Sequence, residues 1–200
     1  MRIFIAGASG VIGVRLVPLL AGSGHVVAAM TRSPAKTGLL HDLGAQPVVC
    51  DVFDADALTR AVSGFGPDVV FHQLTDLPDG AGDIAAFGDR NDRIRTEGTR
   101  NLLAAVAAAG AARVIAQSIS WELPSPRRRA ATAELERAVL RAGGVVIRYG
   151  QLYGPGTYYE TDPPDPPRIH VDDAARQTLP ALAAPPGVTI VADDRAAPAG

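Results

Sequence analysis

Three glycines near the amino terminus are the first residues whose types and spacing suggest chemistry. Gly7, Gly10 and Gly13 follow the apolar run "RIFIA" and precede a segment with helical periodicity. In such a strand-to-helix turn, the first glycine permits the tight bend and the second lets backbone N–H groups approach a pyrophosphate, while the third allows close helix packing. The helix amino terminus adds partial positive charge. The segment therefore predicts a dinucleotide site, and its plainer alternative is a structural turn.

The end of the second predicted strand indicates which dinucleotide is bound. The segment "VVAAMTRSP" carries Thr31 and Arg32 where a chain selective for NAD usually presents a carboxylate to the ribose 2′-hydroxyl. A guanidinium can pair bidentately with a 2′-phosphate, and the segment holds no carboxylate to oppose it, so the sequence favours NADP(H) over NAD(H). The alternative is a surface arginine without a nucleotide role. Asp51 and Val52 are placed to meet the adenine ring, although Asp51 and Asp54 also suit a helix cap.

The elements that must position these residues follow from alternating apolar and helical patterns. We expect strands near 2–6, 25–30, 46–50, 68–73, 113–117, 144–149 and 187–191, and helices near 11–22, 35–43, 54–63, 91–110, 127–142 and 171–184. Several strands are continuously apolar, as strands covered by helices on both faces should be. The predicted fold is therefore α/β, a Rossmann-type doubly wound parallel sheet of about seven strands. The Pro- and Asp-rich stretch 154–167 is expected to form a loop or lid.

Composition narrows the classes of function. Two hundred residues with 47% hydrophobic content predict one domain over 1–200. A net charge of −2 gives no general attraction to nucleic acid or anionic membranes. No apolar run approaches the length of a membrane span, and the amino-terminal apolar stretch breaks at glycine, so we expect a cytoplasmic protein. Cys50 is interpreted as a strand residue rather than a redox group, and the four histidines have no metal-ligand spacing.

The chain resembles the NAD-dependent epimerase/dehydratase group, the extended short-chain dehydrogenase/reductases. The matching segments, in family order, are "GASGVIG" at 7–13, "CDVFD" at 50–54, "VVFHQLTD" at 69–76, "RTEGTRNLLAAV" at 95–106, "RVIAQSIS" at 113–120, "VIRYGQLYGPGT" at 146–157 and "RIHVDDAA" at 168–175. The resemblance implies a nucleotide lying across the carboxyl-terminal strand edges, with substrate above the nicotinamide.

The resemblance also implies roles for individual residues. The phosphate loop would be Gly7, Ser9, Gly10, Val11, Ile12 and Gly13, and the wall beside the nicotinamide ribose would be Gln73, Leu74 and Thr75. Ser118 or Ser120 matches the serine that holds the reacting carbonyl.

The family's catalytic pair is missing. The resemblance calls for a tyrosine and, four residues later, a lysine on the helix after the fifth strand, but the alignment places Arg128 and Thr132 there. Lys36 is the only lysine in the chain, so no shift of alignment restores the pair. An arginine stays protonated and can hold a ribose or phosphate, but it cannot shuttle a proton at neutral pH. The segments that normally build the substrate lobe are also much shortened.

Other side chains are candidates for the missing chemistry. Tyr149, after the sixth strand, replaces a residue that is usually proline in the family and is a candidate acid or base, as is the loop residue Glu122. His170 is interpreted as structural, before a helix that Asp172 or Asp173 would cap. A substrate pocket is expected from Trp121, Tyr149, Tyr153, Tyr158, Tyr159 and the 154–167 loop, completed by a second copy of the chain if it forms a homodimer. Tyr153 is expected chiefly to pack.

Three functions remain open at this point. The first is an NADP(H)-dependent enzyme that acts on a small organic carbonyl or hydroxyl substrate, with Ser118, Ser120 or Tyr149 polarising the carbonyl. The second is a non-redox enzyme, such as an isomerase, cyclase or dehydratase, on the same frame. The third is a non-catalytic module that senses NADP(H) and signals to a partner.

Overall fold

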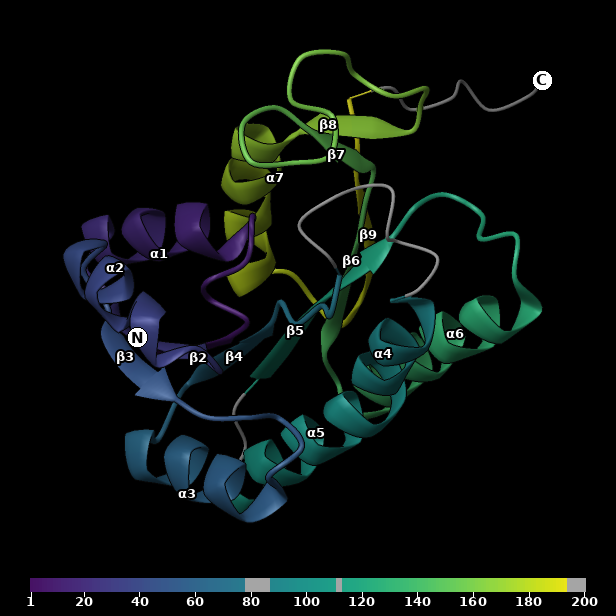
Figure 1. The fold of residues 1–200 in the computed structure, drawn as a ribbon. Helices are drawn as coiled ribbons and strands as arrows, with labels where there is room; N and C mark the ends of the chain where they lie inside the picture. Colours follow the sequence, from purple (N-terminus) through teal and green to yellow (C-terminus); the bar gives the residue numbers. More distant parts are fainter. Residues whose placement is uncertain (78–86, 111–112, 194–200) are drawn as a thin grey trace.

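The protein is built on a parallel sheet of seven strands, in the order β3-β2-β1-β4-β5-β6-β9 (Figure 1). The computed structural model describes residues 1–77, 87–110 and 113–193. The strands are β1 (Arg2–Ala6), β2 (Val26–Thr31), β3 (Gln46–Val49), β4 (Val69–His72), β5 (Arg113–Ile119), β6 (Val145–Tyr149) and β9 (Gly187–Val191). This order and the parallel pairing confirm the predicted Rossmann-type sheet.

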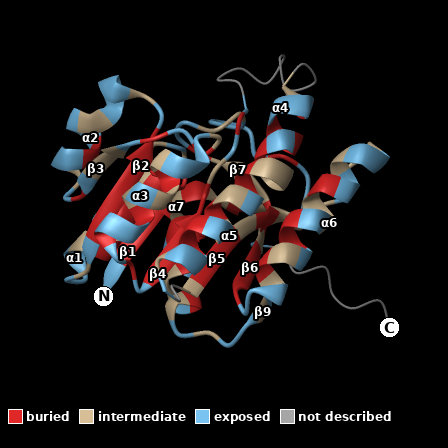
Figure 2. Ribbon diagram, turned by 90° about the horizontal axis from the view of Figure 1, so that it is seen from below, coloured by how far each residue is buried: buried red, intermediate tan, exposed pale blue. Residues whose placement is uncertain are grey.

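Helices cover both faces of the sheet. They are α1 (Gly13–Gly22), α2 (Thr37–Asp42), α3 (Ala55–Phe65), α4 (Gly88–Arg93), α5 (Thr99–Ala108), α6 (Pro126–Arg141) and α7 (Val171–Thr178). One core contains residues of α1, α2 and α7, and the other contains residues of α3, α5 and α6. Figure 2 shows the buried strands between helices whose outer sides are exposed.

Along the strands, successive side chains point alternately into the two cores. In β1, Ile3 and Ile5 enter the core of α1 and α7, whereas Phe4 and Ala6 enter the opposite core. Both faces are therefore apolar, which explains the continuous apolar runs in the sequence. Tyr149 and Ser118 belong to opposite faces of the sheet by the same alternation.

The predicted helix 91–110 is divided into three pieces. The α-helices α4 and α5 are joined by a π-helical turn, Ile94–Gly98. The Thr99 hydroxyl donates to the Ile94 carbonyl, 3.4 Å away and five residues earlier. Such π turns are frequent at functional sites, and periodicity alone does not reveal them.

Smaller corrections concern strand and helix ends. Cys50 lies just beyond β3 rather than in it, because strand pairing stops where Val49 meets Thr31. The predicted helix 171–184 ends at Thr178 and continues as a 3₁₀ turn, Leu179–Leu182. His170, not Asp172 or Asp173, caps α7 by accepting the Asp172 N–H through Nδ1 at 3.3 Å.

The predicted loop 154–167 is framed by two short strands that the sequence did not suggest. They are β7 (Gln151–Tyr153) and β8 (Arg168–His170), which pair in parallel near α7 (Figure 1). Every helix among the described residues is too short or too polar to traverse a lipid bilayer.

Candidate functional site

The glycine turn between β1 and α1 has the shape that a pyrophosphate requires. Gly7 has φ of +89°, and a side chain there would collide with the backbone of Gln73. A Cβ at Gly13 would lie 2.5 Å from the Ala8 carbonyl oxygen. A Cβ at Gly10 would approach only the Gly7 carbonyl oxygen, at 3.3 Å, so the surface above Gly10 is otherwise open. The first and third glycines thus serve packing, and the second leaves room for a ligand.

The same turn offers hydrogen-bond donors to an anion. Within the described ranges, the N–H groups of Val11 and Ile12 donate no hydrogen bond to another backbone group. Ile12 immediately precedes α1, whose amino-terminal end adds partial positive charge. Ser9 is fixed by a side-chain contact, because its hydroxyl lies 2.9 Å from the Thr31 hydroxyl. The Thr31 hydroxyl also accepts a hydrogen bond from the Ser33 N–H at 3.2 Å. These contacts fasten the turn to the end of β2.

Arg32 does not stand free of carboxylates, which corrects the expectation from the sequence. Its guanidinium donates to Asp76 at 2.9 and 3.4 Å, and Arg90 donates to the same carboxylate at 2.9 and 3.0 Å. Asp76 is almost fully buried, with a side chain only 6% exposed, whereas that of Arg32 is 57% exposed. Burial tends to raise the pKa of Asp76, but hydrogen bonds from both arginines lower it below its usual value.

Asp76 is therefore a site residue that reasoning from the sequence missed. It follows β4 and is separated from Arg32 by 44 positions in the chain. The available signal was its place in "HQLTD", directly after a strand that lies near β2 in the sheet.

The residues predicted to meet adenine are engaged with the protein itself. The Asp51 carboxylate accepts the Phe53 N–H at 2.9 Å, and Asp54 caps α3 by accepting the Ala57 N–H. The Val52 side chain is buried among the α3 and α5 residues, and its carbonyl accepts from Asn101. Only the local backbone and the outer side of Asp51 remain to face a nucleotide.

The wall predicted beside the nicotinamide ribose lies directly under the glycine turn. The backbone of Gln73 packs against Gly7, and its buried side-chain amide lies beside the Tyr149 hydroxyl, where it acts to lower the pKa of that tyrosine. The Leu74 carbonyl accepts from Gln117 at 3.1 Å, and Thr75 is exposed.

The three candidate catalytic side chains do not converge. The Ser118 hydroxyl donates to Glu136 at 2.5 Å, facing α6. Tyr149 is buried on the other face, where its hydroxyl lies 2.5 Å from that of Thr178, and burial raises its pKa to about 12. Ser120 lies just past β5, and its hydroxyl is buried without a hydrogen-bond partner among the residues described.

Arg128 and Thr132, which stand where the family has its catalytic tyrosine and lysine, make contacts within the protein. Thr132 donates through its hydroxyl to the Arg128 carbonyl at 2.9 Å. The Arg128 guanidinium lies against the backbone of Gly88, at the start of α4. Neither residue can exchange a proton at neutral pH.

The residues of the predicted aromatic rim differ in their contacts and in their burial. Tyr153 donates to Asp193 at 2.9 Å and meets the His170 ring edge-on, with ring centroids 5.3 Å apart. Trp121 and Tyr158 are half-buried, and Tyr159 is exposed. Glu122 is exposed on its loop.

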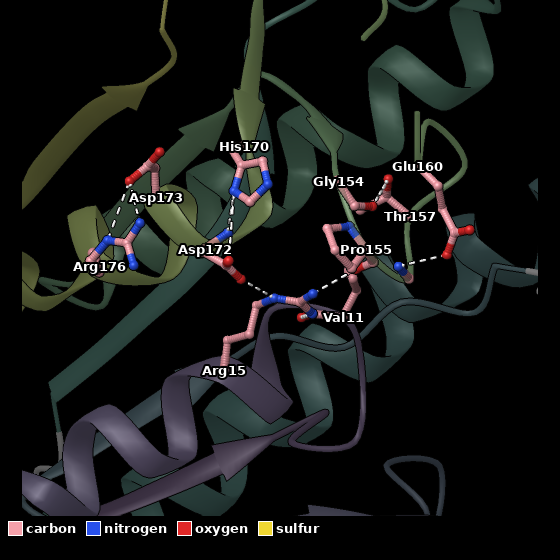
Figure 3. Close-up of polar contacts among 11 residues, drawn as sticks. Val11, Arg15, Gly154, Pro155, Thr157, Glu160, His170, Asp172, Asp173 and Arg176 are labelled. Carbon is pink, nitrogen blue, oxygen red and sulfur yellow. Dashed lines mark hydrogen bonds and ion pairs between the residues drawn. The ribbon is translucent and has the colours of Figure 1, made fainter. Parts of the chain in front are cut away.

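Arg15 fastens the 154–167 loop to the glycine turn (Figure 3). Its guanidinium donates to Asp172 of α7 at 2.6 Å, to the Pro155 carbonyl at 2.5 Å and to the Val11 carbonyl at 2.8 Å. Gly154 completes the junction, since its φ is +100° and a Cβ would strike the His170 ring. One side chain thus joins α1, α7 and the loop.

Comparisons with known proteins agree with this geometry. A profile described as NAD(P)H-binding matches residues 7–142. The 3-diazoavenalumate denitrifying reductase of a Streptomyces species is 36% identical across this entire chain, which covers 78% of that protein. A 4-hydroxy-2-methyl-3-oxo-4-farnesyl-3,4-dihydroquinoline-1-oxide ketoreductase from Stigmatella aurantiaca is 30% identical to this chain. The match covers 77% of this chain and 51% of the ketoreductase.

Solved structures show the same fold. The UDP-glucose 4-epimerase of Thermus thermophilus, solved with NAD, superposes with a TM-score of 0.79 at 20% identity, over 96% of this chain and 78% of that one. The corresponding epimerase of Thermotoga maritima gives a TM-score of 0.77 at 20% identity, with 96% and 77% coverage.

Proposed function

Because this chain belongs to the NAD(P)H-binding family of reductase- and epimerase-like proteins, we propose that it transfers hydride between NADP(H) and a small organic acceptor. The glycine turn carries the proposal, since Gly7 and Gly13 are fixed by packing while the surface above Gly10 is left open. The sheet takes strands from Arg2 to Val191, which supports one cofactor-binding domain over 1–200.

NADP(H) is proposed because the cationic pair Arg32 and Arg90 outnumbers the one carboxylate that both contact. A guanidinium has five N–H donors, and Asp76 occupies the inner side of Arg32. The outer donors of this largely exposed side chain are therefore available to a 2′-phosphate. Asp76 then serves to orient Arg32 rather than to oppose the nucleotide.

The bound dinucleotide would supply the hydride, and the chain's own residues would bind and orient the acceptor. Ser120 is our candidate to hold the acceptor, because its buried hydroxyl lies just past the end of β5 and has no hydrogen-bond partner among the described residues. Ser118 and Tyr149 are assigned to structure, since their hydroxyls are committed to Glu136 and Thr178. Water or the substrate must then supply any proton, because Arg128 and Thr132 cannot.

The absent proton donor also favours a second kind of acceptor. Hydride addition to a carbonyl leaves an alkoxide that must be protonated, which the usual tyrosine would accomplish. Addition of hydride at a diazonium-bearing carbon forms a C–H bond and breaks the C–N bond, releasing dinitrogen without a proton on oxygen. The relative that matches the whole chain is named for a denitrifying reduction of a diazo compound, which supports this alternative.

Calorimetric titration with NADPH, followed by NADPH oxidation assays, tests the proposal. The acceptors are a series of aryl aldehydes and an aryl diazonium salt, each with a blank lacking protein. We expect NADPH binding and oxidation above the blank, and loss of both in Gly10→Val, whose side chain would fill the space above the turn. Gly64→Ala, at an open helix position, is the matched control. Absence of nucleotide binding, or oxidation equal to the blank for every acceptor, would overturn the proposal.

A further inference from the structure

Arg95 places a cation above the carboxyl-terminal edge of the sheet. His72, the last residue of β4, is hydrogen-bonded through Nε2 to the Thr99 hydroxyl at 2.9 Å, which sets Thr99 level with the strand end. The helical stretch 88–108 starts beyond this edge and descends toward the start of β5. Arg95 precedes Thr99 by about one turn, so it lies roughly 5 Å beyond the end of the strand. It is also part of the π-helical turn.

Arg95 also lies across the face of α6 where the missing lysine would be. It interacts electrostatically with Arg128 and Glu136. These two residues are four positions before and four positions after Thr132, so all three share one helix face. Arg95 therefore lies near the position of Thr132, where the family's lysine would stand, and adds a second cation beside Arg128.

Arg95 is close to two carboxylates, Asp92 and Glu136, but forms no direct ion pair with either among the residues that the structure describes. Its half-buried guanidinium makes no hydrogen bond or ion pair with the part of the chain that the structure describes. Glu136 is already occupied by Arg148, at 2.6 and 2.9 Å, and by Ser118. Asp92 is the charged group that acts most strongly on Arg95; its buried carboxylate forms an ion pair with Arg127 at 3.5 Å and makes no hydrogen bond with described residues.

The surroundings of Arg95 are consistent with a site that awaits an anion. Burial lowers the pKa of Arg95 and Arg128 lowers it further, while Asp92 and Glu136 act in the opposite direction. Leaving a guanidinium partly desolvated without an acceptor is costly unless a ligand restores its hydrogen bonds. The glycine turn is the proposed site for the cofactor's pyrophosphate, so we assign an anion at Arg95 to the acceptor.

We propose that Arg95 binds a carboxylate of the substrate, so that the acceptor is a small organic acid. This inference rests on the proposed function and names the substrate class of the same site. A guanidinium matches the two oxygens of a carboxylate in a planar bidentate pair. The carboxylate would fix one end of the acceptor near α6 and leave its reactive carbon toward Ser120 and the nicotinamide position.

Calorimetry with benzoate and benzamide, which differ in charge but little in shape, tests the inference. Each is titrated into protein saturated with NADPH, for wild type, Arg95→Gln, Arg95→Lys and the exposed control Arg100→Gln. We expect benzoate to bind better than benzamide, and Arg95→Gln to weaken benzoate about 10- to 100-fold, as for loss of a charge-assisted hydrogen bond. Arg95→Lys should recover part of the loss, and Arg100→Gln should behave as wild type.

Two further observations separate the possible failures. NADPH affinity and thermal unfolding of Arg95→Gln should match wild type, because Glu136 keeps its contacts with Arg148 and Ser118. Equal binding of the two probes, no benzoate binding, or unchanged benzoate affinity in Arg95→Gln would overturn the carboxylate site. Failure of NADPH to bind would instead overturn the proposed function, and the benzoate titration repeated without nucleotide would then decide the anion site separately.

Discussion

Replacing Arg32 by alanine should change the choice between NADPH and NADH. In the folded protein its guanidinium is held at 2.9 Å by Asp76, with the outer donors exposed to solvent. A charge-assisted hydrogen bond contributes about 1.5–3 kcal/mol, which corresponds to roughly 10- to 150-fold in affinity. We therefore expect Arg32→Ala to weaken NADPH by about that factor and to leave NADH nearly unchanged, since NADH has no 2′-phosphate.

Calorimetric titration of both nucleotides into wild type, Arg32→Ala and Asp76→Asn checks this expectation. Asp76→Asn removes the carboxylate that orients Arg32 while keeping the guanidinium charge, so its NADPH affinity should fall less than that of Arg32→Ala. Arg90→Ala should resemble Asp76→Asn if Arg90 acts mainly by holding the same carboxylate. Equal losses for NADPH and NADH in Arg32→Ala, or no loss for either, would refute the assignment of Arg32 to the 2′-phosphate.

Two other predictions concern buried groups. Tyr149→Phe should lower the free energy of unfolding by about 1 kcal/mol, because the contact with the Thr178 hydroxyl is lost. The same variant should leave kcat unchanged in the NADPH oxidation assay. A large fall in kcat would instead identify Tyr149 as a catalytic residue. Burial lowers the pKa of His72 from 6.5 to about 4, so the unfolded chain takes up a proton before the folded protein does. The free energy of unfolding should therefore fall by about 3 kcal/mol as the pH drops from above 6.5 to about 4. In urea unfolding, the free energy of unfolding of His72→Gln should depend less on pH than that of the exposed control His41→Gln.

The sequence predicted those features that depend on local pattern. The run "RIFIA" and the three glycines define β1, the turn and α1, because strand burial and turn geometry are imposed within a dozen residues. The parallel, doubly wound character of the sheet also followed, since alternating strands and helices with doubly apolar strands admit few other arrangements.

Side-chain partners were much less predictable. Arg32 and Asp76 meet although 44 positions separate them, and Ser118 meets Glu136 across 18 positions. Such pairs depend on which strand and helix faces are apposed, and alternation fixes a face only once the exact register is known. The π-helical turn at Ile94–Gly98, which contains Arg95, departs from the regular helical pattern that the sequence predicted.

The contacts of Arg15 impose an order on the maturation of this protein during synthesis. Arg15 and Asp172 are separated by 157 positions, so the glycine turn emerges from the ribosome long before the residues that brace it. Because domains fold as their chains emerge, a nascent chain ending before Pro155 would carry the turn without two of the three acceptors that fix Arg15. Competence for tight nucleotide binding should therefore arise late, after the residues from Pro155 to Asp172 have been translated and folded.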